Sequence, residues 1–391
     1  MDEPDSGGGE EMTKTVAHIH HRYSPARLDL HNELSKRGVF NSVLITERYI
    51  PRSVEPYPGT RYLFKAPSGN LFYRVDKIVT ENPIYRRSLT RFFIRNIKES
   101  HASIMHAHFG MTGYRAMDAV AALKLPFVLT LYGVDGSYCL KDTKWIGRFK
   151  KLFSAADRIV VLCEEVKRRV AALGYPEEKI RIWNCLEDIT FYSYTKRPKV
   201  NGAVNFMIAA RFVEKKGYPM LLGAFKRIHT EHPDVRLTMI GYGPGRAEVA
   251  ENCKRLGISG SIEIVPTDEV LDFPSLYKGH LAKGHIFVMP SIAAKDGDDE
   301  GGPALSLIAA QASGLPVIAT RFPGAERSVV DNVTGIYTEA DEDSLYERML
   351  YLYMHPELWD KLGEAASLYV KKEFSVPDQV VRMESIYEEL V

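Results

Sequence analysis

The feature that most constrains the fold of this chain is a regular alternation of short apolar runs with segments of helical periodicity. Runs such as SVLIT (residues 42–46) and LPVIAT (residues 315–320) have the length and the β-branched content of buried strands. Strands that alternate with helices form parallel sheets, because each helical crossover returns the chain to the same edge. The sequence therefore predicts an α/β protein built on parallel sheets.

The alternation occurs as two series, separated by a segment at 188–204 that contains Pro198 and resembles an interdomain linker. A chain of 391 residues suits two domains. In the first series we expect strands at 15–21, 42–46, 103–110, 126–133, 156–163 and 179–184, and helices at 26–37, 114–123 and 164–173. In the second we expect strands at 205–211, 235–245, 261–265, 285–291, 315–320 and 334–338, helices at 219–230, 246–256 and 303–313, and helices from 343 to the end.

Composition excludes several classes of protein. No run reaches the roughly 18 consecutive apolar residues of a membrane-spanning helix. Residues 1–12 are acidic and glycine-rich, which is unlike a signal peptide, so we expect these residues to form a disordered leader. Residues 13–189 carry 29 Lys and Arg against 17 Asp and Glu, so this half should face an anionic partner. Four cysteines without metal-ligand spacing indicate free thiols in a reducing cytoplasm: Cys139, Cys163, Cys185 and Cys253.

The segment DDEGGPALSLIAAQASGLPVIAT (residues 298–320) places an acid, two glycines and a proline directly before a predicted helix. Gly301 and Gly302 allow backbone N–H groups to approach a ligand closely, and Pro303 favours entry into a helix. The N–H groups at a helix start attract an anion such as a diphosphate, and the Glu300 carboxylate can accept hydrogen bonds from sugar hydroxyls. An ordinary loop with an acidic helix cap would explain the same residues.

Two further segments follow predicted strands. In ARFVEKKG (residues 210–217), Arg211 and Lys216 can bracket a diphosphate and stabilise it as it departs, whereas Lys215 is expected to be a solvated surface charge. Surface solvation could also account for the other two cations. In GYGPG (residues 241–245), the glycines allow a tight turn against a phosphate or ribose, or form the turn alone. Ligands of open parallel sheets bind at the carboxyl ends of the strands, where these segments lie.

In this order and spacing, the segments ARFVEKKG, IGYGPG, FVMPS, EGGP, QASGLPVIAT and PGAERSVVDNVTG resemble glycosyltransferase family 4, in particular its exopolysaccharide and colanic-acid-type members. The likeness covers residues 103–332 and is strongest in the C-terminal half. It implies the GT-B fold, two facing Rossmann-like domains with parallel sheets and an interdomain cleft. The implied divisions are an acceptor-binding domain at 13–189, a nucleotide-sugar-binding domain at 204–375, and a helix at 376–391 that packs back on the first domain.

The resemblance also implies a retaining transfer of a hexose-type sugar from a UDP- or GDP-sugar, with no metal ion or other cofactor. Arg211 and Lys216 match the cations that hold the donor diphosphate. Glu300 matches the first acid of a paired-glutamate motif, and these three are the expected catalytic residues. Pro266 falls where the family contacts the base. The other expected donor-binding residues are Gly241, Tyr242, Gly243, Gly301, Gly302, Pro303 and Ala309.

The chain departs from the family pattern at two positions. TLYGVD (residues 130–135) matches Thr-Phe-His-Gly-x-Asp near the transferred sugar, with Tyr132 in place of the histidine and with Gly133 and Asp135 retained. A phenol can hydrogen-bond a sugar but does not titrate near neutral pH. Ala309 replaces the second glutamate, which binds ribose, after one extra residue beyond Pro303. Loss of that hydrogen bond costs roughly 1.5–3 kcal/mol, so Ala309→Glu is expected to tighten donor binding.

Histidines and arginines of the first half suggest further contacts. Alternation along a strand places His106 and His108 on one face, and His18, His20 and His21 end another strand. No carboxylate or cysteine lies nearby at ligand spacing, so packing at the cleft edge, or acceptor contact by His20 and His108, is favoured over a metal site. The segment at 85–98 could be a helix with four cations at helical spacing: Arg87, Arg91, Arg95 and Lys98. These cations either bind an anionic membrane or form the solvated face of a helix whose other face packs on the core.

We therefore expect a cytoplasmic glycosyltransferase of cell-surface polysaccharide synthesis. Peripheral contact with the inner face of the membrane is one of the two alternatives for the segment at 85–98, and the solvated helix face is the favoured one. Its partners would be a nucleotide sugar and a saccharide or lipid-linked acceptor, and not nucleic acid. A hinge between the domains would close to exclude water. Two alternatives remain at this stage: a nucleotide-sugar-binding protein whose catalysis Ala309 has weakened or abolished, and a nucleotide-sugar 2-epimerase.

Overall fold

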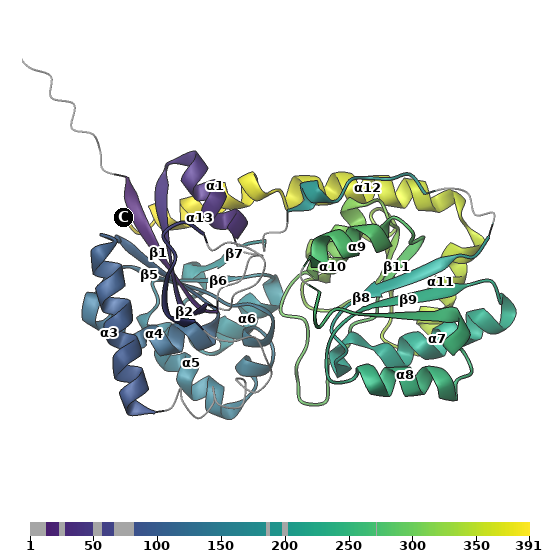
Figure 1. Ribbon diagram of the computed structural model, residues 1–391, viewed down its shortest axis with the longest axis horizontal. Helices are drawn as coiled ribbons and strands as arrows, with labels where there is room; N and C mark the ends of the chain where they lie inside the picture. Colours follow the sequence, from purple (N-terminus) through teal and green to yellow (C-terminus); the bar gives the residue numbers. More distant parts are fainter. Residues whose placement is uncertain are drawn as a thin grey trace, which may run out of the picture.

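The computed structural model describes residues 13–22, 28–49, 57–65, 82–184, 188–197, 202–270 and 272–391. The predicted leader at 1–12 and residues 198–201 of the predicted linker lie outside this part of the chain. Two α/β lobes lie side by side along the long axis of the molecule, each built on one sheet (Figure 1). We call them the N-terminal lobe and the C-terminal lobe.

The N-terminal lobe contains a parallel sheet in the order β3-β2-β1-β4-β5-β6-β7. Its apolar runs become strands because their side chains are buried between flanking helices, as the burial patterns of β4 and β5 show. Its strands are β1 (Lys14–Arg22), β2 (Phe40–Tyr49), β3 (Arg61–Lys65), β4 (Ile104–His108), β5 (Phe127–Thr130), β6 (Arg158–Val161) and β7 (Ile180–Ile182). Its helices include α1 (Leu28–Arg37), α3 (Pro83–Glu99), α4 (Gly110–Leu123), α5 (Thr143–Ala155) and α6 (Glu164–Ala172).

The C-terminal lobe contains a parallel sheet in the order β10-β9-β8-β11-β12-β13, the order of a Rossmann fold. Its strands are β8 (Asn205–Ala209), β9 (Arg236–Gly241), β10 (Ile262–Pro266), β11 (Ile286–Met289), β12 (Val317–Thr320) and β13 (Ile336–Thr338). Its helices include α7 (Tyr218–Glu231), α8 (Arg246–Arg255), α9 (Phe273–Leu281), α10 (Leu305–Ala312), α11 (Glu342–Met354) and α12 (Glu357–Glu373).

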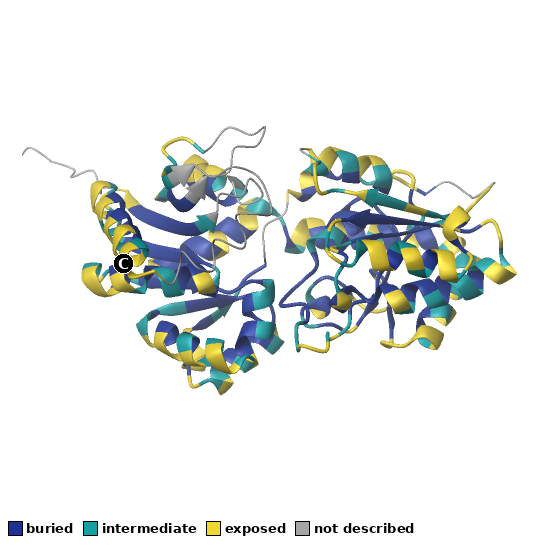
Figure 2. Ribbon diagram, turned by 60° about the horizontal axis from the view of Figure 1, so that its bottom comes forward, coloured by how far each residue is buried: buried dark blue, intermediate teal, exposed yellow. Residues whose placement is uncertain are grey.

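Every strand predicted from the sequence is present, and the parallel α/β class is confirmed. Among the described strands and α-helices, the edge strand β3 and the helices α5 and α9 were not predicted. In both lobes the central strands are buried and the helices expose their outer faces, which Figure 2 shows as dark blue strands under partly yellow helices, whereas the edge strand β10 is only partly buried. None of the described helices combines the length and the apolar content that crossing a membrane requires.

The last helix, α13 (Val376–Glu388), returns to the N-terminal lobe. Along one edge of Figure 1, α12 lies on the C-terminal lobe and α13 continues onto the other. Val380, Met383 and Tyr387 are buried in the same apolar cluster as Val16 of β1. The indole N–H of Trp183 donates to the Gln379 carbonyl at 2.9 Å. The described residues therefore belong to the N-terminal lobe up to β7, to the C-terminal lobe from Ile189 through α12, and to the N-terminal lobe again in α13.

Candidate active site

The loops that follow β8 and β11 leave the C-terminal sheet at adjacent positions. These two strands pair with each other although α7, β9, α8, β10 and α9 lie between them in the sequence, so this is the point where the strand order reverses. Ligands of such sheets bind at this point, beyond the carboxyl ends of the strands. The loop after β8 carries Lys216, in the short 3-10 helix η6 (Glu214–Lys216), and the loop after β11 carries Glu300.

Glu300 and Lys216 form a buried ion pair at this edge of the sheet. The Lys216 ammonium donates to Oε1 of Glu300, and the Ser291 hydroxyl donates to the same oxygen at 2.8 Å. The Ser291 carbonyl in turn accepts from the Thr320 hydroxyl at 2.5 Å, which ties the loop to β12. Burial by itself would raise the pKa of Glu300, but the charges of Lys216 and Lys215 and the two hydrogen bonds outweigh it and lower the pKa. Glu300 is thus ionised at neutral pH.

Lys215 is not the solvated surface charge expected from the sequence. Its side chain is 3% exposed, and its ammonium donates to the Asp298 carboxylate at 3.0 Å and to the Asp299 carbonyl at 2.7 Å. A lysine with this burial needs such partners, because an unpaired charge in the interior is costly. The prediction was wrong because sequence alone did not show that two consecutive lysines in a 3-10 turn would both point toward the acidic loop.

Arg211 and the GYGPG turn lie at the same edge of the sheet. Arg211 follows β8 and is exposed. The amide of the next residue, Phe212, donates to the Tyr242 carbonyl at 2.7 Å, so the two loops are neighbours. Gly243 has φ +137, and a Cβ there would lie 2.8 Å from the Phe212 carbonyl oxygen. Pro266, the last residue of β10, is in register with Gly241 of β9.

The turn at Gly301–Pro303 contacts the N-terminal lobe. A Cβ on Gly301 would lie 2.3 Å from the Gly133 carbonyl oxygen, and one on Gly302 would lie 2.5 Å from Cβ of Leu162. The glycines therefore allow the two lobes to approach each other closely at this point. Pro303 does not begin the helix, as the sequence suggested: α10 starts at Leu305, with Ala304 as its N-cap and no side chain capping it.

Ala309 lies inside the C-terminal core. It is 1% exposed and belongs to an apolar cluster with Tyr277, Met289 and Ile308. A glutamate at this position would bring a carboxylate into apolar surroundings. The structure therefore favours a loss of stability for Ala309→Glu over the tighter donor binding that the family pattern suggested.

The segment at 130–135 supports the turn that meets Gly301, and its polar side chains point into the N-terminal lobe. The Tyr132 hydroxyl hydrogen-bonds Nδ1 of His108 at 2.9 Å, and the ring is 5% exposed. Asp135 is fully buried, and its carboxylate accepts from the Gly110 amide at 3.0 Å. Both residues were expected on the acceptor or sugar side of the site. In this structure they instead fix the conformation of Gly133, the residue of this segment that touches the opposite lobe.

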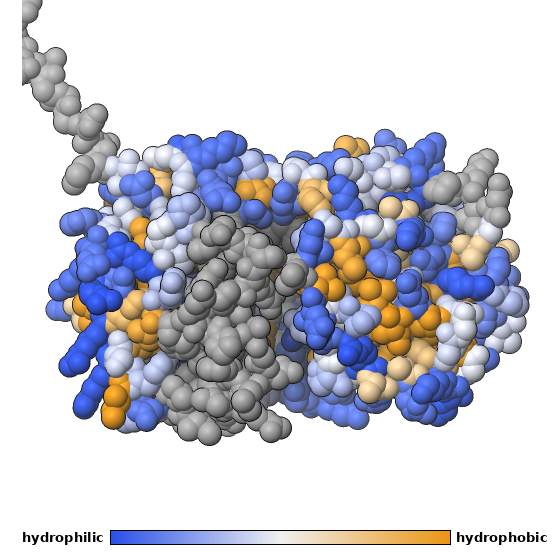
Figure 3. All heavy atoms as spheres, in the orientation of Figure 1, coloured by the Kyte–Doolittle hydropathy of each residue, from blue (hydrophilic) through white to orange (hydrophobic). Residues whose placement is uncertain are grey.

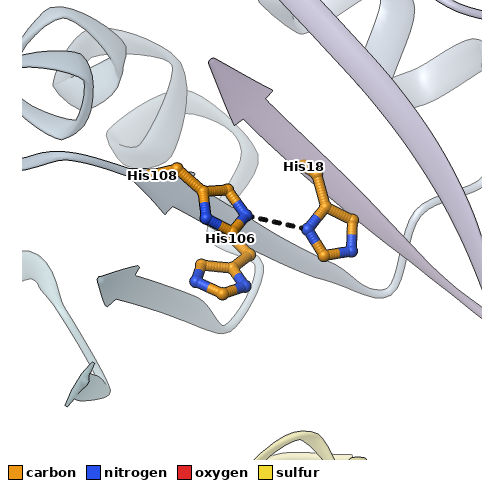
Figure 4. A group of neighbouring side chains, drawn as sticks. All are labelled: His18, His106 and His108. Atoms are coloured by element: carbon orange, nitrogen blue, oxygen red, sulfur yellow. Dashed lines mark hydrogen bonds between the residues drawn. The ribbon is translucent and has the colours of Figure 1, made fainter. Parts of the chain in front are cut away.

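The histidines form a buried cluster and do not line a cleft edge. Figure 4 shows His18, His106 and His108 side by side, with Nδ1 of His18 and Nε2 of His108 at 3.0 Å. His20 stacks on His108, with ring centroids 4.3 Å apart. Burial, with the nearby histidines, holds the pKa of His18 well below its ordinary value. His20 and His108 are 4% and 1% exposed, so in this arrangement acceptor contact by either side chain is not supported.

Three of these histidines could be considered as metal ligands. One ring nitrogen from each of His18, His106 and His108 lies within 4.8 Å of the others. The rings of His106 and His108 are stacked at 4.1 Å, however, so their in-plane lone pairs do not converge on one point. His106 also uses both nitrogens, with the Tyr387 hydroxyl and the Thr130 hydroxyl at 2.7 Å each. This geometry fits a hydrogen-bonded cluster better than a metal site.

Several residues of the site were missed by sequence reasoning. Ser291 could have been noticed at the end of FVMPS, because it follows a buried strand at the same edge as Arg211. The acidic run before Glu300 was a signal for Asp298 and Asp299. Nothing local marked their partners on the other lobe, Lys141 and Arg169, which bind Asp299.

Two family models match the two lobes. The model described as Glycosyltransferase Family 4 matches residues 27–189, and the model described as Glycosyl transferases group 1 matches residues 195–368. The amylovoran biosynthesis glycosyltransferase AmsK of Erwinia amylovora is 26% identical over 265 residues, which cover 66% of this chain and 63% of AmsK. The chain thus spans less than two thirds of the length of this relative.

Solved structures confirm the GT-B fold. Sucrose-phosphate synthase from Thermosynechococcus elongatus has a TM-score of 0.77 at 17% identity, with 96% of this chain and 99% of that chain covered. HepE of Anabaena in complex with UDP-glucose has a TM-score of 0.70 at 13% identity, with 95% and 99% covered. At these identities the likeness concerns the fold alone.

Proposed function

This chain belongs to the glycosyltransferases of family 4, with a C-terminal lobe of the group 1 type, and on that basis we propose that it is a retaining hexosyltransferase. It moves a sugar from a UDP- or GDP-sugar to a saccharide or lipid-linked acceptor, in the synthesis of an exopolysaccharide. AmsK is named as a glycosyltransferase of amylovoran biosynthesis, and this supports the proposed acceptor of exopolysaccharide synthesis. HepE, solved with UDP-glucose, supports the kind of donor.

The observation that carries the proposal is the buried pair of Lys216 and Glu300 at the switch point of the C-terminal sheet. Beside this pair, α10 begins without a side-chain cap, so its first N–H groups are available to an anion. Arg211, exposed at the same edge, adds a second cation. Two cations and an uncapped helix start are the groups that a departing diphosphate requires, since negative charge accumulates on it as the sugar leaves.

In the proposed mechanism the donor diphosphate shares Lys216 with Glu300. Lys216 then stabilises the leaving group, and Glu300, ionised because its pKa is lowered, accepts hydrogen bonds from the hydroxyls of the sugar. The acceptor approaches from the N-terminal lobe, near Gly133. The acceptor hydroxyl bonds to the anomeric carbon on the face from which the diphosphate leaves, so the configuration is retained. The bond to the diphosphate breaks, and a diphosphate oxygen takes the proton of the hydroxyl. No metal ion enters this scheme, because lysine and arginine supply the positive charge.

A peripheral membrane contact through α3 belongs to the same proposal. The helix packs Leu89, Phe93 and Ile97 against the sheet and exposes a stripe of cations on its other face: Arg87, Arg91, Arg95 and Lys98. None of these four side chains pairs with a carboxylate of the described residues. In Figure 3 the edge of the N-terminal lobe where Figure 1 places α3 is mostly blue, with a few orange spheres among the blue ones. Like charges at helical spacing repel each other, so an anionic surface would stabilise this stripe.

The test is release of free UDP or GDP from nucleotide sugars, measured with and without saccharide and lipid-linked acceptors. We expect one nucleotide series to support slow release alone and faster release with acceptor, and Lys216→Ala to abolish both. Equal release with and without acceptor, together with interconversion of the donor sugar, would indicate the 2-epimerase instead. Nucleotide-sugar binding without any release would indicate a protein that only binds.

A further inference from the structure

The acidic loop before Glu300 is held by side chains of the opposite lobe. Arg169 of α6 forms a bidentate ion pair with the Asp299 carboxylate, at 3.0 and 2.8 Å. The Lys141 ammonium donates to the same carboxylate at 2.9 Å and to the Gly297 carbonyl at 2.7 Å. The side chains of Asp299 and Arg169 are 6% and 17% exposed, so their ion pair is largely shielded from solvent, whereas Lys141 is 39% exposed. Asp299 is the residue directly before Glu300.

The neighbouring carboxylate is held from both lobes. Asp298 accepts from the Ser137 hydroxyl of the N-terminal lobe at 2.5 Å and from the Lys215 ammonium of its own lobe at 3.0 Å. Lys215 also donates to the Asp299 carbonyl at 2.7 Å. The loop is thus fixed on one side to the sheet that carries Lys216 and on the other side to the N-terminal lobe.

These bonds lie outside the apolar clusters of the two lobes. Each lobe has its own sheet and its own apolar clusters. Arg169 already has an acid on its own helix, Glu165, at 3.0 Å. Buried ion pairs contribute little net stability compared with apolar packing, so their presence between two lobes points to a role in geometry. The same loop continues into Gly301, which lies against Gly133 of the opposite lobe.

We propose that Asp299 is a positioning residue, which together with Arg169 and Lys141 holds the two lobes closed around Glu300 and Lys216 before any substrate binds. The proposal concerns lobe closure, and only its consequence for catalysis rests on the proposed sugar transfer. A closed cleft excludes water, so the bonds of Asp299 to Arg169 and Lys141 would favour transfer to the acceptor over hydrolysis of the donor. When these bonds are removed, the lobes should separate, and hydrolysis of the donor should increase relative to transfer.

Small-angle X-ray scattering of the ligand-free protein tests closure directly. The variants are Asp299→Asn and Arg169→Gln, each alone and combined, with Arg168→Gln as the matched control. Arg168 is the adjacent arginine of α6, bonded to Glu165 and mostly exposed. We expect both single variants to have a larger radius of gyration than the parent, the double variant to be no larger than either, and the control to be unchanged. Circular dichroism checks that each variant folds.

Identical scattering from the parent and from both single variants would overturn the proposal, as would an equal expansion of the control. Since this experiment uses no substrate, its result stands whether or not the protein transfers sugar. Where transfer is measured, Asp299→Asn should raise the ratio of donor hydrolysis to transfer and the KM for acceptor, with little change in donor affinity. A fall in turnover with an unchanged ratio would indicate that Asp299 does not act through closure.

Discussion

At the scale of single residues, the candidate side chains differ in burial and in pairing. Glu300, Lys215 and Lys216 are buried and paired, whereas Arg211 is exposed. The sequence indicated which residue types would gather at this edge, because motif order and strand ends are local information. It did not indicate the burial of Lys215 or the inward direction of Tyr132, because both depend on packing against distant segments.

Replacement of Lys216 by methionine should leave the Glu300 carboxylate buried without its cation. Loss of one partner of a buried ion pair costs about 3–5 kcal/mol, so Lys216→Met should lower the free energy of unfolding by that order. Glu300→Gln in the same chain should restore part of it. Urea titration measures this, with the exposed Lys254→Met as control. A loss as small as that of the control would show that the pair is solvated.

Ala309→Glu should be destabilising. Its carboxylate would enter an apolar cluster, at a cost of about 2–4 kcal/mol. The exposed Ala247→Glu, in the first turn of α8, should change stability by less than about 0.5 kcal/mol. Thermal unfolding compares the two variants. An unchanged melting temperature with tighter nucleotide binding would restore the ribose role that the family pattern suggested.

At the scale of elements, the predicted strands and most helices were correct because hydrophobic periodicity and turn residues are local features of the sequence. The edge strand β3 was missed because it is short and half exposed. The start of α10 was misplaced because Pro303 is typical of a first helical turn, yet here it lies in the turn that meets the other lobe. Contacts between elements, such as those of Glu47, cannot be predicted from local sequence patterns.

Glu47 joins four elements of the N-terminal lobe. Its carboxylate, on β2, accepts from Arg115 of α4 at 2.7 Å, contacts His21 of β1 at 2.7 Å, and also bonds Tyr85 of α3. Burial would raise the pKa of Glu47, but His21, Arg115 and Tyr85 together lower it to about 2. A depressed pKa contributes stability above the ordinary value of 4.5, and this stability is lost as pH falls toward 2.

The predicted consequence is an acid-sensitive stability that depends on Glu47. The shift corresponds to at most about 3 kcal/mol. Urea titrations between pH 6 and pH 3 should show a smaller loss of stability in Glu47→Gln than in the parent, because the variant has no carboxyl group to protonate. Parallel pH profiles for the two proteins would contradict the assignment.

The basic stripe of α3 should bind anionic vesicles. Each cation near such a surface contributes about 1 kcal/mol, so replacement of the four stripe residues by glutamine should reduce binding by more than about tenfold. Flotation with phosphatidylserine vesicles measures this, with neutral vesicles and high salt as controls. No binding by the parent protein would remove the membrane contact from the proposal and leave a solvated helix face.

At the scale of the whole molecule, two lobes with separate cores meet through polar side chains and glycines. The resemblance to the family predicted the two lobes but not the contacts between them. The account rests on one claim, that the carboxyl edge of the C-terminal sheet holds a diphosphate. Arg211, exposed at this edge, and Arg236, exposed at the start of β9 on the opposite edge, make a matched pair for testing it.

The most direct measurement is the thermal shift that nucleoside diphosphates produce, compared with that of the corresponding nucleosides, in the parent, Arg211→Ala and Arg236→Ala. Ligands stabilise the folded state more the more tightly they bind it. The account predicts a larger shift from UDP or GDP than from the nucleoside in the parent and in Arg236→Ala. It predicts an affinity about 10–100-fold lower in Arg211→Ala, the loss of one charge-assisted hydrogen bond. Equal shifts in Arg211→Ala and the parent would contradict it.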